Sequence, residues 1–256
     1  MIKIKRQLTS GIIEGNDVTK KYKKVTALNE VSFSVKRNSI TALVGSNGAG
    51  KTTLMRLFLN IIPKNAGTIK IDGLDSVNNY RAIRKMIGYL PEERGINEHY
   101  KPYEWMRFFS DVYKIKNWKQ IFDGYLREFE LWDFRKKTME TLSKGMKQKM
   151  AFIRLLMVPS KILILDEPSS GMDPLAVVQL KQKIMQFKKE GKTILLSTHQ
   201  LSFAEDICED IIVLNKGKKL FEGNISSFKK KGRFNNIEKA YIKLMRADYE
   251  SYTSPV

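Results

Sequence analysis

A glycine-rich stretch near residue 50 has the residue types and spacing of a phosphate-binding loop. The segment GSNGAGKTT, residues 45–53, fits the pattern G-x-x-x-x-G-K-[ST], with Gly45, Gly50, Lys51 and Thr52 at the defining positions. Glycines let the backbone approach a phosphate closely, so that N–H groups and the positive end of a helix meet the negative charge. We predict that Lys51 bridges the β- and γ-phosphates and that the Thr52 hydroxyl binds magnesium.

A pair of acidic residues follows a second apolar run, ILILDEP at residues 162–168. Asp166, at the end of this buried strand, is placed to hold magnesium, usually through water. Because successive side chains alternate along an extended segment, Glu167 is expected to point elsewhere and to face the attacking water as general base. Alone, such a pair is equally well explained as a helix cap. After a phosphate-binding loop it favours hydrolysis.

A histidine ends a third apolar run. His199 directly follows TILLST, residues 193–198, at the sheet edge where ligands bind in α/β folds. A neutral imidazole at that edge can hydrogen-bond a γ-phosphate. A lone histidine is more often an ordinary buried or solvated residue, and His99 is assigned no role.

Strands and helices must hold these residues, and the chain alternates between the two patterns. VSFSV at 31–35 alternates as a half-buried strand does, and ITALVG at 40–45 is continuously apolar, as a buried strand is. The helix after the glycine-rich loop has apolar residues at helical spacing, namely Leu54, Leu57, Phe58 and Ile61. Further strands are expected at 67–73, 87–91, 161–168, 193–198 and, as a pair turning at Lys216 and Gly217, 211–223; further helices are expected at 175–191, ended by Gly191, and 201–210. The fold is therefore predicted to be α/β, with a largely parallel sheet covered on both faces.

Helical periodicity replaces the strand patterns between Pro91 and Thr141. One face there collects Trp105, Phe108, Phe109, Val112 and Tyr113, and a later face collects Ile121, Phe122, Tyr125 and Phe129. We interpret these faces as the core of a helical subdomain at about residues 92–158, whose exposed members would form a partner groove. The last stretch, 226–256, is predicted to be a basic and helical C-terminal tail.

The composition is that of a globular protein with a strong basic charge. A formal net charge of +19 is typical of proteins that bind nucleic acid or an anionic membrane surface. The lysines are spread along the chain without the interleaved aromatic residues of a base-stacking platform, so no nucleic-acid partner is expected. No apolar run is long enough to span a membrane, and the start MIKIKRQLTSG lacks the apolar core of a signal peptide. Cys208 is the only cysteine, and a cytoplasmic location is expected.

The motifs, taken together, resemble those of a known family. The series resembles that of an ATP-binding cassette (ABC) ATPase, the nucleotide-binding subunit of ABC transporters: Tyr22, GSNGAGKTT, GYLPEE, LSKGMKQ, ILILDEP, SSGMDP and STH. The resemblance covers about residues 13–225. It implies a P-loop NTPase core with a mostly parallel sheet, an antiparallel β subdomain and a helical signature subdomain, all within a domain at residues 1–225. It also implies ATP and Mg²⁺ as cofactors.

The resemblance gives the remaining motifs their roles. Tyr22, upstream of the first predicted strand, would stack on adenine. Ser143 and Gly145, in the stretch that matches the family signature, would bind the γ-phosphate of ATP held by an opposite subunit. Asp173 would cross that interface and couple the two sites. Glu92, where the family usually has Gln, would contact water or magnesium.

The implied site therefore has three groups of residues. The catalytic residues are Glu92, Glu167 and His199. The metal ligands are Thr52, Asp166 and Glu92. The cofactor-binding residues are Tyr22, Gly45, Ser46, Asn47, Gly48, Ala49, Gly50, Lys51, Thr52, Thr53, Ser143, Gly145 and Asp173. The signature departs from the family at Lys144, which replaces Gly, and at Met146, which replaces Gln.

The function implied by the resemblance is ATP hydrolysis that powers export of a drug, an antimicrobial or toxic peptide, or a similar cargo. The chain would act as a head-to-tail dimer, with a second copy or a different ATPase, under a separate transmembrane permease at the cytoplasmic face of the cell membrane. The main alternative is a soluble ABC ATPase acting on nucleic acid or ribosomes. The basic charge favours this alternative, but the short link between Lys51 and Ser143 and the single cassette do not. A binding module without catalysis is disfavoured by Glu167 and His199.

Overall fold

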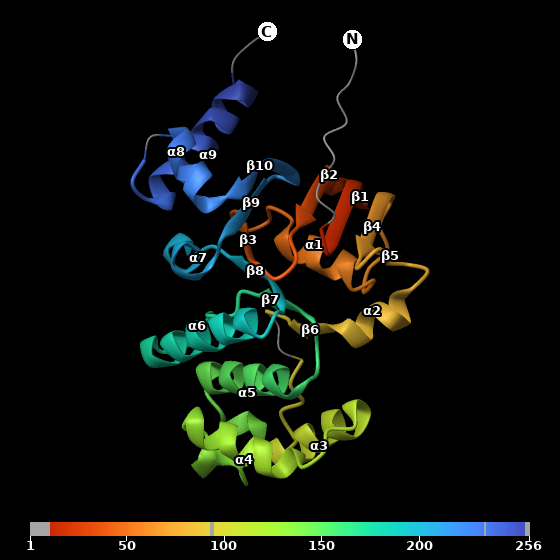
Figure 1. Cartoon of the computed structure of the whole chain (residues 1–256), viewed down its shortest axis with the longest axis vertical. Coiled ribbons are helices and arrows are strands. Elements are labelled where there is room, and N and C mark those ends of the chain that lie inside the picture. The colour runs from red at the N-terminus through yellow and green to blue at the C-terminus, as the bar shows by residue number, and fades with distance from the viewer. Residues whose placement is uncertain (1–10, 93–94, 233, 254–256) are drawn as a thin grey trace. The chain divides into compact units, whose positions relative to one another are not determined.

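The structure, a computed structural model, describes residues 11–92, 95–232 and 234–253, which form two compact units (Figure 1). One unit combines the chain up to Lys85 with the chain from Thr193 onward, and the other spans Met86–Lys192. The expectation that MIKIKRQLTS is no signal peptide falls on residues 1–10, outside the described residues.

The first unit contains an antiparallel sheet in the strand order β2-β1-β4-β5. Its strands are β1 (Ile13–Tyr22), β2 (Val25–Val35), β4 (Ala66–Ile71) and β5 (Leu74–Asp75). Val31, Phe33 and Val35 of β2 are buried, as the alternation of VSFSV predicts. This sheet is the expected antiparallel β subdomain. Tyr22 is the last residue of β1, so the prediction that it lies upstream of the first strand was wrong.

A second set of strands in the same unit is mostly parallel, in the order β10-β9-β3-β8. Its strands are β3 (Ile40–Val44), β8 (Thr193–Thr198), β9 (Asp210–Asn215) and β10 (Lys218–Asn224). β3 pairs in parallel with both β8 and β9, and all of its residues are buried, which explains its continuous apolar sequence. The predicted turn between β9 and β10 is confirmed: Lys216 and Gly217 have φ of 45° and 74°, as a tight hairpin turn requires.

Five helices belong wholly or mainly to the first unit as described. They are α1 (Lys51–Phe58), α2 (Tyr80–Met86), α7 (Leu201–Ile207), α8 (Ile225–Gly232) and α9 (Ile237–Thr253). The apolar face of α1 is buried through Leu54, Leu57 and Phe58. The helix ends at Phe58, so the prediction that Ile61 continues this face was wrong: Ile61 lies beyond the helix and is 51% exposed.

The second unit carries a parallel strand pair and a group of helices. β6 (Ile87–Leu90) and β7 (Ile162–Asp166) pair in parallel register from Ile87 opposite Ile162 to Leu90 opposite Leu165. Its helices are α3 (Pro102–Tyr113), α4 (Trp118–Glu128), α5 (Lys144–Met157) and α6 (Pro174–Lys189), with short 3₁₀ turns at Trp132–Phe134 and Met139–Thr141. Gly191, at φ 82°, follows α6 as the predicted C-terminal stop.

The helices α3, α4 and α5 pack together around an aromatic core (Figure 1). Phe129 and Phe152 meet edge to face, with 5.9 Å between ring centroids, and Trp105 is buried beside Phe109. Phe108 and Val112, predicted on the same core face as Trp105, are instead 63% and 59% exposed. That single face therefore divides into a buried half and an exposed apolar half.

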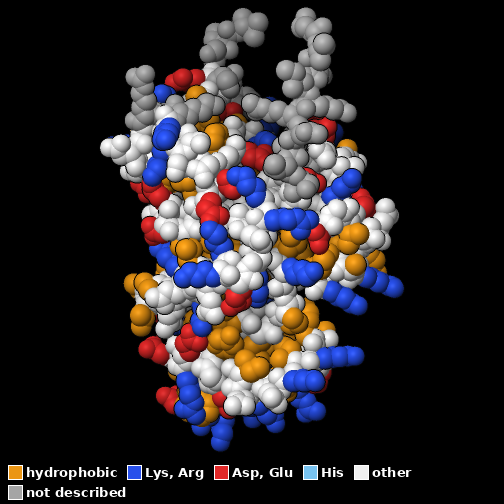
Figure 2. All heavy atoms as spheres, viewed as in Figure 1, with side chains coloured by type: hydrophobic (Ala, Val, Ile, Leu, Met, Phe, Trp, Pro, Cys, Tyr) orange, Lys and Arg blue, Asp and Glu red, His pale blue; other side chains and the backbone are white. Residues whose placement is uncertain are grey.

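The face of the molecule drawn in Figure 2 carries many basic side chains. In Figure 2, Lys and Arg side chains occur across the whole visible face, with Asp and Glu side chains among them. On this face the basic side chains are interspersed with acidic ones. Within the described ranges, every helix is too short or too polar to cross a bilayer.

Candidate functional site

The glycine-rich loop joins the buried strand β3 to the helix α1, as predicted. A Cβ added to Gly45 would lie 2.4 Å from the Leu214 carbonyl oxygen and 2.8 Å from Ala49 Cβ, so only glycine fits there. Gly48 and Gly50 have φ of 78° and 107°, which other residues rarely adopt. The loop is thus shaped by its glycines.

The exposed side of this loop is its tip, residues 46–48, whereas Ala49 and Lys51 are buried. The Lys51 ammonium donates hydrogen bonds to the carbonyl oxygens of Gly45 at 2.8 Å and Ser46 at 3.3 Å. These contacts hold the cation inside the loop. Thr52 and Thr53 are half-buried in the first turn of α1.

The strand register of the first unit brings His199 to the loop's edge of the sheet. Val44, the last residue of β3, is the parallel partner of Thr198, the last residue of β8. Gly45 and His199 therefore each follow directly after the carboxyl end of one of two neighbouring parallel strands. Ligands bind at this edge in α/β folds. The sequence prediction placed His199 at this edge, and the register confirms that placement.

Tyr22 lies in the hairpin between β1 and β2, where it pairs with Val25. Its side chain is 42% exposed. The Lys20 ammonium lies 4.7 Å from the centre of the Tyr22 ring and also donates a 2.7 Å hydrogen bond to the Pro63 carbonyl. Lys20 is buried, so this cation is fixed against the ring. Sequence reasoning assigned Lys20 no role.

The acidic residues of the second unit gather at the carboxyl ends of β6 and β7. Asp166 ends β7 and is fully buried, and Glu92 follows Leu90, the partner of Leu165, by two positions. Glu167 is also buried, but its φ is 48°. The expectation that Asp166 and Glu167 alternate as on an extended strand was wrong, because the chain leaves the β conformation at Glu167.

The signature residues begin α5. Ser143 is the N-cap of this helix, and its hydroxyl oxygen accepts a 3.2 Å hydrogen bond from the Met146 N–H. Gly145 lies against the loop after β7: a Cβ at this position would be 2.5 Å from the Gly171 carbonyl oxygen. The signature turn is therefore in direct contact with that loop.

Two polar residues of α5 bind the same loop, which carries Asp173. The buried Gln148 amide donates a 2.9 Å hydrogen bond to the Pro168 carbonyl, and the Lys149 ammonium pairs with Asp173 Oδ2 at 2.9 Å. Asp173 Oδ1 accepts from the Ala176 N–H at 2.8 Å and caps α6. The hydrogen bond from Lys149 is the largest cause of the lowered pKa of Asp173.

Sequence reasoning missed Gln148 and Lys149, although a signal existed. Both are buried in a stretch of α5 where apolar residues follow, from Met150 to Ile153. A buried polar side chain needs a hydrogen-bond partner. A glutamine and a lysine adjoining an apolar helical run therefore indicate a polar contact with another segment.

Replacing Gly145 with alanine is expected to destabilise the protein by about 1–3 kcal/mol, because the new methyl group collides with backbone rather than with a flexible side chain. Thermal unfolding would measure the change. Gly124→Ala is the matched control: Gly124 lies inside α4, and an added Cβ there meets nothing within 4 Å. This control should be neutral or stabilising. Equal melting temperatures for the two variants would contradict the contact.

The geometry defines a class of protein, and comparisons define its family. A glycine loop of this pattern between a buried strand and a helix is typical of a P-loop nucleotide-binding protein. A family model described as ABC transporter matches residues 28–170. The chain belongs to the ABC transporter family, as an ATPase that binds ATP.

Individual relatives agree with this assignment. An uncharacterized ABC transporter ATP-binding protein of Methanocaldococcus jannaschii is 36% identical over 221 residues, which are 86% of this chain and 80% of the relative. The lantibiotic transport ATP-binding protein SrtF of Streptococcus pyogenes is 32% identical over 206 residues, 80% of this chain and 88% of the relative. A solved structure of an ATP-binding subunit of an ABC transporter has a TM-score of 0.84 and 28% identity, and the match covers 91% of this chain and 99% of that chain.

Proposed function

We propose that this chain is the ATP-hydrolysing subunit of an exporter and drives a separate transmembrane permease. The observation that carries the proposal is that the candidate groups follow the carboxyl ends of paired parallel strands in each unit. The glycine loop and His199 follow β3 and β8, and Asp166 with Glu167 follows β7. Each unit thus carries candidate groups where ligands bind in α/β folds, which supports a role in ATP hydrolysis.

The glycine loop would bind the phosphates of ATP through its N–H groups and Lys51. Lys51 would exchange its present carbonyl acceptors for phosphate oxygens. Glu167 would take a proton from the attacking water, whose oxygen bonds to the γ-phosphorus. The bond from that phosphorus to the β–γ bridging oxygen then breaks, which leaves ADP and phosphate. His199 would hydrogen-bond the γ-phosphate.

Magnesium fits the oxygen donors of this site. Mg²⁺ prefers hydroxyl, carboxylate, phosphate and water oxygens and usually takes only one or two carboxylates from a protein. Thr52, Asp166 and Glu92 supply such donors, and among the residues that the structure describes no His, Cys, Asp and Glu cluster offers a competing metal site. Bound Mg²⁺ would neutralise phosphate charge. Burial of Asp166 would strengthen its attraction for the ion.

Lys20 would position Tyr22 for adenine. The Lys20→Met variant is expected to raise KM for ATP about three- to tenfold with kcat within about twofold, because the ring loses its fixed cation but the phosphate site is untouched. Steady-state ATPase assays would measure both constants, and Lys20→Arg should restore KM. Lys21→Met, one residue along β1 and exposed, is the control. Equal KM values for Lys20→Met and Lys21→Met would contradict the role of Lys20.

Two subunits would share each ATP site. Ser143 and Gly145 of one subunit would contact the γ-phosphate bound by the glycine loop of the other, in a head-to-tail dimer with two-fold symmetry. The contacts of Gly145, Gln148 and Lys149 with the loop that carries Asp173 would make both parts of that interface move together. ATP binding would close the dimer, and hydrolysis would reopen it.

The permease would bind the helical region of the second unit. Phe108 and Val112 expose apolar surface on α3. A cytoplasmic segment of a membrane protein can cover this surface. Beside them, Arg154 lies 4.9 Å from the centre of the Phe109 ring and donates to the Tyr89 carbonyl at 2.9 Å, which ties α3 and β6 to α5. The lantibiotic-transport relative makes an antimicrobial peptide the cargo class that we favour.

Production of the chain together with any multi-span membrane protein encoded beside its gene would test this function. The two should co-purify in detergent, and cells that make both should survive a lantibiotic better than cells that make the membrane protein with the Glu167→Gln chain. Co-purification with ribosomes or nucleic acid, and not with the membrane protein, would instead establish the soluble alternative.

A further inference from the structure

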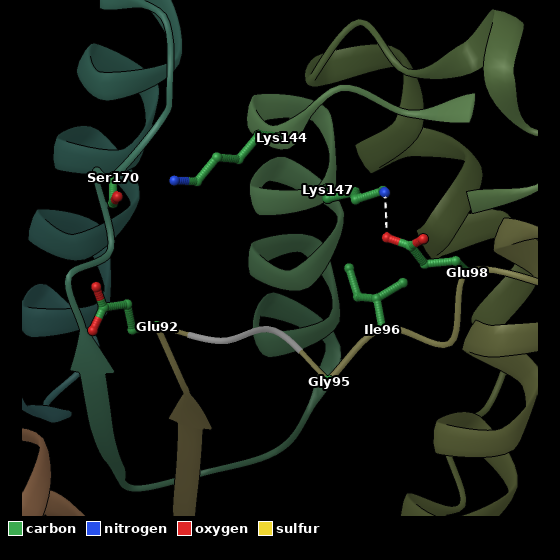
Figure 3. Close-up of a pocket in the computed structure, with 7 residues that line it drawn as sticks. All are labelled: Glu92, Gly95, Ile96, Glu98, Lys144, Lys147 and Ser170. Carbon is green, nitrogen blue, oxygen red and sulfur yellow. Dashed lines mark hydrogen bonds and ion pairs between the residues drawn. The ribbon is translucent and has the colours of Figure 1, made fainter. Parts of the chain in front are cut away.

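Lys144, one of the two residues at which the signature departs from the family pattern, lines a pocket at the start of α5. The cavity has a volume of about 430 Å³ and lies within the second unit. Its described lining residues are Glu92, Gly95, Ile96, Glu98, Lys144, Lys147 and Ser170 (Figure 3). Lysines of one helix therefore face a water-accessible space beside the signature turn.

The two lysines of this pocket differ in their partners. Lys147 turns to Glu98, with 2.5 Å between the ammonium and the carboxylate, and this hydrogen bond is the largest cause of the lowered pKa of Glu98 (Figure 3). Lys144 points in another direction, toward the segment of Ser170, and has no carboxylate partner among the described residues. Lys147 is therefore paired locally with Glu98, whereas Lys144 has no such ion pair within residues 11–92, 95–232 and 234–253.

The alkyl chain of Lys144 rests on a glycine. Its Cγ, Cδ and Cε lie 3.5–3.7 Å from the point that a Cβ of Gly171 would occupy. Gly171 has φ of 75°, so a larger residue would be strained there. The stem of Lys144 is thus packed along the loop after β7, although the side chain as a whole is exposed.

The Lys144 ammonium lies beside the first turn of α5 and points toward the segment of Ser170 (Figure 3). Lys144 is the first residue after the N-cap Ser143, and helical side chains lean toward the N-terminus. Lys144 therefore belongs to the first turn of the helix, whose N–H groups have no intrahelical acceptors. A cation there adds a full charge to a helix end that already favours anions.

We propose that Lys144 is a further ATP-binding residue, whose ammonium contacts the γ-phosphate of the nucleotide held by the opposite subunit. The inference rests on the proposed function, because only the shared-site dimer brings that phosphate to Ser143. ADP lacks the γ-phosphate, so the contact favours the ATP-bound closed dimer over the ADP-bound one. Glu92 lines the same pocket and is assigned to the magnesium of its own subunit.

ATP-driven dimerisation of the Glu167→Gln chain would test this contact. Sedimentation with ATP and Mg²⁺ gives the dimer dissociation constant, and the same measurement with ADP gives the reference. Adding Lys144→Met should weaken the ATP-dependent dimer about tenfold and flatten its dependence on salt, since methionine keeps the packed stem and removes the charge. Lys144→Arg should retain the dimer.

Lys147→Met is the matched control, from the same helix and the same pocket. Its ammonium already pairs with Glu98, so the dimer constant should stay within about twofold of the parent value. ATP binding by each separate subunit and its thermal unfolding would confirm that every variant is folded.

The outcomes separate the two levels of the proposal. An unchanged dimer constant for Lys144→Met, or a weakened dimer with the parent's salt dependence, would overturn the role of the Lys144 charge and leave the shared site standing. A parent Glu167→Gln chain that binds ATP but never dimerises would overturn the shared-site model, and the Lys144 contact with it.

Discussion

Replacement of Glu167 with glutamine is expected to slow ATP hydrolysis by about 10²- to 10⁴-fold, the contribution typical of a general base, and to leave ATP binding intact. Glutamine keeps the size of the side chain but cannot take a proton from water. The phosphate-binding loop lies in the other unit, at residues 45–53, and is not altered by this change. Turnover should therefore fall while the dissociation constant for ATP stays nearly constant.

Single-turnover hydrolysis and equilibrium nucleotide binding would measure the two quantities separately. Glu167 is buried and has a positive φ, and glutamine tolerates that backbone about as well, so unfolding temperatures should agree with those of the parent. Glu140→Gln is the control, because Glu140 is exposed in the same unit and outside the candidate site. Undiminished turnover in Glu167→Gln would remove Glu167 from the mechanism.

Much of the site was predictable because its chemistry is local in sequence. A glycine loop between a continuously apolar strand and an amphipathic helix leaves few alternatives, and the structure has β3, the loop and α1 in that order. The prediction that His199 lies at the loop's edge of the sheet also required that β3 and β8 be parallel. The alternation of strands and helices along the chain already indicated a parallel sheet. The turn at Lys216 and Gly217 followed from its residue types.

The sequence did not predict those features in which the backbone departs from regular strand geometry. The sequence did not predict β1, because register shifts between Gly15 and Lys21 interrupt the strand. Its buried residues therefore do not alternate regularly with exposed ones. Glu167 was expected to alternate with Asp166, but a positive φ ends the strand between them. Such local turns in the backbone have no periodic signature.

The sequence also did not predict contacts between segments that are distant along the chain. Periodicity groups Phe108 and Val112 with Trp105, but the position of α4 and α5 decides which of them is covered. In the same way, the binding of Gln148 and Lys149 to the loop after β7 depends on tertiary packing. Helical spacing can show that a residue lies on a face, but not what lies opposite that face.

Mixing two inactive variants is expected to restore ATPase activity, if each site is shared between subunits. A Lys51→Ala subunit loses its phosphate-binding cation but keeps an intact signature. A Ser143→Arg subunit keeps its glycine loop but places a large cation at the N-cap of α5, where the hydroxyl binds the first turn. Each homodimer then has two defective sites. The mixed dimer joins the intact loop of one subunit to the intact signature of the other, so one of its sites is complete.

Random pairing in an equal mixture gives about one quarter of wild-type activity if the two sites of a symmetric dimer act independently. Differently tagged subunits, made together and purified through both tags, would isolate the mixed dimer and remove the homodimer background. Adding Lys51→Ala to the Ser143→Arg subunit is the control, because the mixed dimer then has no complete site. Activity no higher than this control would contradict shared sites. Recovered activity would establish that residue 143 acts across the subunit boundary, because no single chain in the mixture contains a complete site.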